Sequence, residues 1–196
     1  MRKLSAGLAI AASVASLVVF SAAQEKKAAS SDAAYIAKAM SAAPKAVAKD
    51  AAIIRFDESG KMSTLKDGKN GFNCMVMDKE AMCADANSMA FFDAYMKHQP
   101  PPEKLGLTYM LRGDDGASNT DPYAKGKTAD NHWVVTGPHV MIVGASAKAL
   151  GLSSNAEANP AGPYMMWPGT PYEHAMIPVS SGKMTAPSAG GMAEKK

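Results

Sequence analysis

Two short segments, "PHVMIV" and "EHAMIP", each place a histidine two residues before a methionine. Side chains two residues apart in a strand point to the same side, so His139 would share a side with Met141, and His174 with Met176. Imidazole together with thioether suits copper, above all Cu(I). If the two strands are neighbours, parallel pairing brings the two imidazoles together, whereas antiparallel pairing brings each imidazole closer to the other strand's methionine. These four residues are the candidate metal site.

The same pattern has a second interpretation as ordinary core packing. The chain contains 15 methionines among 196 residues, and methionine is an adaptable filler of hydrophobic cores. The apolar run after His139 indicates a strand buried on both faces. In that case the two histidines only mark the starts of strands, and the protein needs no cofactor. Other methionines that could join a copper site are Met75, Met77, Met82, Met165 and Met166.

His174 also supports an enzymatic alternative. It follows Glu173 directly, and a histidine beside a carboxylate can act as a general base in a small hydrolase or lyase. No motif in the chain defines a substrate, so we expect a non-enzymatic binding or accessory protein rather than an enzyme. Its ligand, a small molecule or a protein, is not specified by the sequence.

Two long loops are expected at 112–131 and 152–173, and the second is dense in aromatic residues. Aromatic side chains bury a large apolar body while keeping a polar tip available, so they can line a ligand groove or bind a partner protein. The candidate ligand-binding residues are Trp133, Tyr164, Trp167 and Tyr172, with Tyr123 nearby in the first loop. We expect the pocket at the end of the sheet where His139 and His174 begin their strands.

The beginning of the chain predicts export. A basic start is followed by an apolar stretch and then by small residues, which is the pattern of a cleaved secretory signal over residues 1–23. Removing Arg2 and Lys3 with it lowers the formal net charge from +3 to +1. This balance gives no basic surface for nucleic acid, and no later segment is apolar enough to span a membrane. We therefore expect a periplasmic or secreted protein.

The only two cysteines, Cys74 and Cys83, are close in sequence. In an exported protein such a pair indicates a local disulfide. A catalytic dithiol usually has two residues between its cysteines, and this pair has eight. We predict a structural bridge.

The hydrophobic pattern predicts a single α+β domain over residues 32–179, with a mainly antiparallel sheet and two or three helices. Residues 24–31 and 180–196 are predicted to be a flexible leader and a disordered tail. Helices are expected at 32–43, 84–98 and 147–151, and strands at 51–56, 61–66, 71–77, 105–111, 132–144 and 174–179. The first three strands read as an antiparallel meander. Met89, Phe92, Tyr95 and Met96 form the expected apolar side of the second helix.

The segments "NTDPY", "GPHVMIVG" and "PYMMWPGTPYEHAMIPV" resemble a group of small exported bacterial proteins of unassigned function. The resemblance covers most of the chain before the tail. It implies export and a single domain, and it transfers no catalytic residue.

Overall fold

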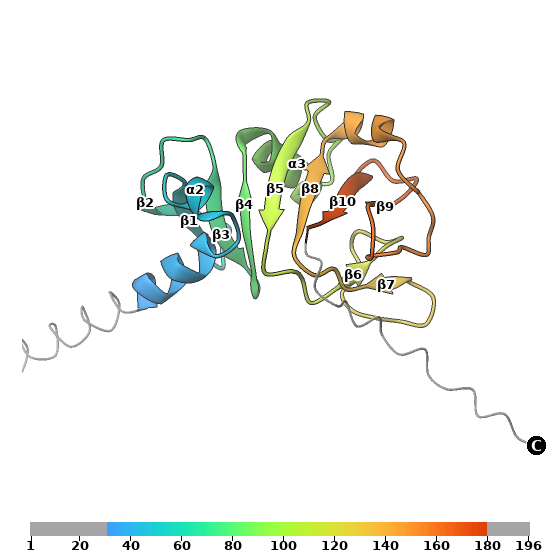
Figure 1. Ribbon diagram of the computed structural model, residues 1–196, viewed down its shortest axis with the longest axis horizontal. Helices are drawn as coiled ribbons and strands as arrows, with labels where there is room; N and C mark the ends of the chain where they lie inside the picture. Colours follow the sequence, from blue (N-terminus) through green and yellow to red (C-terminus); the bar gives the residue numbers. More distant parts are fainter. Residues whose placement is uncertain (1–30, 180–196) are drawn as a thin grey trace, which may run out of the picture.

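One sheet of eight strands forms the centre of the protein, in the order β2-β1-β3-β4-β5-β8-β10-β9 (Figure 1). The computed structural model describes residues 31–179, so the predicted signal peptide, nearly all of the leader and the tail lie outside it. The strands are β1 (Ala52–Phe56), β2 (Met62–Lys66), β3 (Asn73–Met77), β4 (Glu80–Ala84), β5 (Gly106–Met110), β8 (His139–Val143), β9 (Tyr164–Met166) and β10 (His174–Pro178). The prediction of a single α+β domain with a mainly antiparallel sheet is confirmed.

Helices cover this sheet, and a two-stranded sheet lies beside it. The first helix occupies residues 31–40. It is followed by α2 (Lys45–Ala48), α3 (Ala86–Met96) and the short 3-10 helix η1 (Ala145–Leu150), while β6 (Ala117–Ser118) pairs with β7 (Trp133–Val134). No helix among residues 31–179 is both long and apolar enough to cross a membrane.

The first three strands do not form the expected meander. β1 and β2 pair antiparallel, but β3 then returns to the other side of β1 and pairs with it in parallel over Ala52 and Ile53. Beyond these pairs, the hydroxyl of Tyr35 bridges the two strands. It donates to Ile54 O at 2.9 Å and accepts from Val76 N at 3.0 Å. A residue of the first helix thus completes the hydrogen bonding that the short parallel ladder leaves open.

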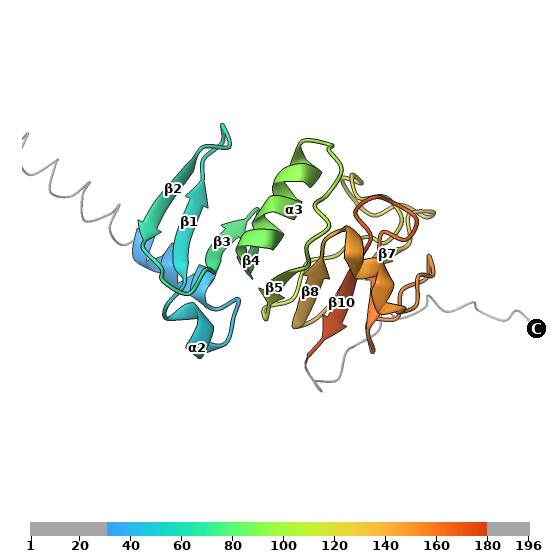
Figure 2. The same ribbon diagram turned by 90° about the horizontal axis from the view of Figure 1, so that it is seen from above.

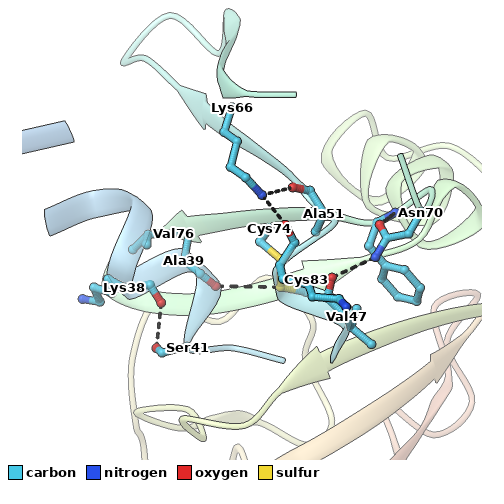
Figure 3. The surroundings of a disulfide bond; sticks show 12 residues. Lys38, Ala39, Ser41, Val47, Ala51, Lys66, Asn70, Cys74, Val76 and Cys83 are labelled. Carbon is cyan, nitrogen blue, oxygen red and sulfur yellow. Dashed lines mark hydrogen bonds between the residues drawn. A yellow bond between two sulfur atoms is a disulfide. The ribbon is translucent and has the colours of Figure 1, made fainter. Parts of the chain in front are cut away.

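A tight hairpin joins β3 to β4, a strand that the sequence pattern does not reveal. Its turn is Asp78-Lys79, with Asp78 in the left-handed region at φ 51°. Cys74 and Cys83 lie directly opposite each other in this hairpin and form the predicted disulfide, with their Cα atoms 3.9 Å apart. The bridge is buried beneath the first helix, where Cys83 Sγ lies 3.7 Å from Ala39 O (Figure 3).

The two sides of the sheet carry different cores. The alanine cluster lies beneath the first helix and α2; its buried members are Ala39, Ala42, Ala43, Ala48, Ala51, Ile53, Cys74, Ala81 and Cys83. The methionine cluster lies on the side of α3; its buried members are Ile54, Met75, Met82, Ala84, Phe91, Met110, Val134, Met141, Val143, Tyr164, Met166, Tyr172 and Met176. Figure 2 shows α3 and α2 on opposite sides of the sheet.

Asp85 fixes α3 to the sheet. One of its carboxylate oxygens caps the helix by accepting from Ser88 N at 2.8 Å, and the other accepts from Leu107 N in β5 at 2.9 Å. The helix then buries Phe91 completely, while Met96 is 63% exposed. The predicted apolar side of this helix is therefore only partly right, because the side facing the sheet is centred on Phe91.

Candidate functional site

The two strands with the repeated His-x-Met pattern are neighbours and run antiparallel. Met141 of β8 lies directly opposite Met176 of β10. Because side chains alternate along a strand, His139 shares the side of Met141, and His174 shares the side of Met176. All four predicted metal ligands therefore point to the α3 side of the sheet, where both methionines belong to the methionine cluster.

The same register separates the two histidines. His139 lies opposite Pro178, and His174 is four residues away from Pro178 on β10. At about 3.3 Å per residue, the histidines start about 13 Å apart along the strands. The strand starts are thus at opposite ends of the sheet, and the single pocket expected at one common end is not formed.

Each histidine has a further methionine directly across from it. Met166 of β9 lies opposite His174, and Met110 of β5 lies opposite His139. The result is a continuous line of imidazoles and thioethers across four strands, which we call the His–Met track. Its members are Met110, His139, Met141, Met176, His174 and Met166.

Both imidazoles are held in the same way. Nδ1 of His139 lies 2.7 Å from Gly137 O, and Nδ1 of His174 lies 2.9 Å from Tyr172 O. A carbonyl oxygen only accepts, so Nδ1 carries the proton and Nε2 carries the lone pair. Burial lowers the pKa of His139, and it lowers the pKa of His174 to about 4. Both rings are therefore neutral at pH 7, in the tautomer that leaves Nε2 available as a metal ligand.

A series of contacting aromatic rings leads from His174 to the surface. The Trp167 ring lies 4.8 Å from the His174 ring and stacks at 5.3 Å on Tyr95 of α3. Tyr95 stacks at 5.1 Å on Tyr123, which in turn stacks at 4.2 Å on the exposed His98. Trp167 is fixed in place because its Nε1 donates to Ser118 O at 2.9 Å.

The predicted ligand-binding aromatics do not form one groove. Trp167 and Tyr172 both contact Tyr95, but Tyr172 is buried and its hydroxyl donates to Gln99 O at 3.0 Å. Tyr164 is also buried, and its hydroxyl lies 2.7 Å from Thr136 Oγ1.

Trp133 lies elsewhere, in β7 of the small sheet. Its indole packs over Gly116, where an added Cβ would lie 2.2 Å from Nε1. These contacts show that Tyr164, Tyr172 and Trp133 pack against other parts of the protein.

Glu173 is not directed toward His174. Its carboxylate accepts from Ser154 Oγ at 2.6 Å and from Gly169 N at 3.2 Å. His174 is only 2% exposed, and a pKa of about 4 makes its imidazole a weak base at pH 7. The geometry offers little to the enzymatic alternative.

A charged cavity of about 500 Å³ lies at the His139 end of the sheet, lined by Lys38, Ser41, Lys79, Glu80, Ala81, Arg112, Gly113, Asp114 and Asp115. Burial raises the pKa of Glu80, and it raises that of Asp114 to about 6. Glu80 Oε1 accepts from Asp115 N at 2.8 Å, and Asp114 Oδ1 accepts from Thr136 N at 2.8 Å.

No three His, Cys, Asp or Glu side chains among residues 31–179 are grouped so as to hold a metal ion. The sequence pattern includes Met166 among the further candidate copper ligands, but it does not single out Met110. Only the strand register shows which methionine lies opposite which histidine. The chain matches no family model, no curated protein and no solved structure with which it was compared.

Proposed function

We propose that this protein is an exported, non-enzymatic Cu(I)-binding protein whose primary ligands are His174, Met166 and Met176. The observation that carries the proposal is the register: Met166 lies directly opposite His174, and Met176 is two residues further along the same strand on the same side. One imidazole and two thioethers thus start from adjacent positions of one sheet face. This is a ligand set that favours Cu(I) over hard or strongly oxophilic ions.

The surroundings of His174 support a ligand role. The hydrogen bond from Nδ1 to Tyr172 O fixes the ring and directs the lone pair of Nε2 away from the backbone. A backbone carbonyl is one of the usual partners of a metal-bound histidine in this position. Phe91 and Trp167 lie edge-to-face against the imidazole, with ring centroids 6.0 and 4.8 Å away. His174 is only 2% exposed beneath these rings. A site shielded from water favours the singly charged Cu(I), because burying a charge is costly.

This register divides the four ligands expected from the sequence into two pairs, His139 with Met141 and His174 with Met176. The two imidazoles start about 13 Å apart along the strands, so His139 and His174 would have to span that distance to share an ion. We therefore propose that His174 binds with its own neighbours Met166 and Met176, and that His139 does not complete this site.

Export accords with the disulfide. Disulfides form and persist in oxidising compartments such as the periplasm or the extracellular space, and Cys74 and Cys83 are joined. Since that disulfide occupies both cysteines, thiolate is not available as a copper ligand in the oxidised protein. We propose a periplasmic or secreted location, where the protein would bind copper through thioether and imidazole.

The experiment is an anaerobic titration of the full-length mature protein with Cu(I) in competition with a chromogenic Cu(I) chelator. We expect His174→Ala and the double variant Met166→Leu/Met176→Leu to bind Cu(I) at this site at least 10-fold more weakly than the unaltered protein. Met165→Leu is the matched control: Met165 is 1% exposed and adjacent in sequence, but its side chain points to the opposite side of the sheet. Equal binding by all four proteins, or no competition by the unaltered protein, would overturn the proposal.

A second readout uses fluorescence. Trp133 and Trp167 are the chain's two tryptophans, so Trp133→Phe leaves Trp167 as the reporter beside His174. Adding Ag(I), a redox-inert substitute for Cu(I), should quench this emission in the Trp133→Phe protein. The quenching should disappear when His174→Ala is added. Quenching that is unchanged by His174→Ala would place the ion elsewhere.

A further inference from the structure

We infer that the His–Met track holds a second Cu(I) ion at its other end, bound by His139, Met110 and Met141. The inference rests on the proposed function, because it assumes that the His174 end binds the same ion. Met110 lies directly opposite His139, and Met141 is two residues further along β8 on the same side. This arrangement repeats the relation of His174 to Met166 and Met176.

An unpartnered buried atom points independently to a ligand at this end. His139 is 0% exposed, and its Nε2 has no hydrogen-bond partner among the described residues. Nδ1 already donates to Gly137 O at 2.7 Å, so the free nitrogen is the one with the lone pair. A buried acceptor without a partner destabilises the folded state, and a metal ion bound to Nε2 would remove that cost.

A second polar atom without a partner lies beside it. Thr108 is fully buried directly opposite Met141, and its Oγ1 also lacks a hydrogen-bond partner within residues 31–179. The unpartnered hydroxyl of Thr108 thus lies on the residue opposite Met141, one of the proposed ligands of the second ion. Packing alone would be served better by valine at this position, since valine has nearly the same shape and no hydroxyl.

The two ends of the track differ in their surroundings. Glu80 begins β4 at the same end of the sheet as His139, and its carboxylate acts electrostatically on that imidazole. Glu80 also lines the charged cavity with Arg112 and Asp114. The His174 end is instead covered by the ring of Trp167. The His139 end thus lies near a charged cavity and the His174 end lies against an aromatic ring, while both imidazoles are buried.

The paired sulfurs of Met141 and Met176 lie between the two sites. They are directly opposite each other, and each belongs to one of the two ligand sets. An ion that leaves His139 would therefore meet the thioether of Met176 next. The track therefore provides ligands of one chemical class between the two imidazoles.

Native mass spectrometry of the mature protein with Ag(I), together with the Cu(I) titration, tests this inference. We expect two ions per chain in the unaltered protein and one in His139→Gln. The Met110→Leu/Met141→Leu variant, which keeps the core volume, should also bind one ion, with the affinity of the remaining site changed less than threefold. Met75→Leu is the control, because Met75 is equally buried in the methionine cluster and pairs with Met82 rather than with a histidine.

The outcomes separate the two proposals. A stoichiometry of two that falls to one with either His139→Gln or His174→Ala supports both. One ion that is lost only with His174→Ala overturns the second site and leaves the proposed function standing. Two ions retained in Met110→Leu/Met141→Leu and in His139→Gln also overturn the second site. No binding by the unaltered protein overturns both.

Discussion

The two sides of the sheet differ in the size of the side chains that pack against them. On one side the alanine cluster brings the first helix close to the strands with small side chains, and a disulfide joins two of those strands. On the other side the methionine cluster fills the space beneath α3 with large, flexible side chains and leaves polar atoms of His139 and Thr108 without partners. The first side is fully used by its own packing. The second side keeps buried polar atoms without hydrogen-bond partners, and the proposed copper ligands lie on this side.

The largest expected effect lies on the methionine side. Phe91 is completely buried and its ring contacts the rings of Tyr172 and His174. Phe91→Ala should lower the free energy of unfolding by about 3–5 kcal/mol, because it removes the transfer energy of the ring and leaves a cavity. Urea unfolding measures this effect. Phe91→Leu should cost clearly less, and an equal loss in both variants would show that the ring's volume is not what holds α3.

The disulfide gives the next largest effect, on the opposite side of the sheet. Replacing Cys74 and Cys83 together by alanine should lower the free energy of unfolding by about 2–3 kcal/mol, since the bridge closes a short loop in the unfolded chain. Chemical denaturation of the two proteins measures the loss. Binding of Cu(I) at pH 7 should be unchanged, because no proposed ligand contacts the bridge. A variant that folds but loses Cu(I) would show that the two sides are not independent.

Asp114, which lines the charged cavity, should make stability depend on pH. Burial raises the pKa of its carboxyl group from 3.8 to about 6, so this group favours the folded state below about pH 4, and that contribution is lost as the pH rises through 6. Asp114→Asn should remove this contribution to the pH dependence. After allowance for solvent screening, it should stabilise the protein by about 1–2 kcal/mol at pH 7. Thermal unfolding at pH 4 and pH 7 tests this, with the exposed Asp115→Asn as the control. Equal pH profiles for Asp114→Asn and the unaltered protein would contradict it.

A last effect, similar in size, concerns a single hydroxyl on the alanine side. Tyr35→Phe leaves Ile54 O and Val76 N without their bridging partner, which should cost about 1–2 kcal/mol in the free energy of unfolding. Hydrogen exchange should show faster exchange at Val76 N in particular. Tyr109→Phe, on the same cluster, is the control. Equal protection of Val76 N in both variants would mean that the strands close without the hydroxyl.

Local patterns identified most of the elements but not their partners. The hydrophobic pattern predicts strands around "AAIIRF", "LGLTYML" and "HAMIPV", and they occur as β1, β5 and β10. β4 was missed because its turn, Asp78-Lys79, depends on a left-handed aspartate rather than on glycine. The parallel pairing of β1 with β3 was also missed, since no turn sequence encodes a pairing between strands separated by another strand.

The sequence by itself determined which residues could do chemistry here. The two His-x-Met repeats give each strand one side with imidazole and thioether, because side chains alternate in any strand. The spacing of Cys74 and Cys83 likewise determined a local bridge. Only the tertiary structure decided that the histidines lie at opposite ends of an antiparallel pair, and that Met166 and Met110 face them. Register is set by long-range pairing and by burial of one side of the sheet, and neither is contained in a local stretch of sequence.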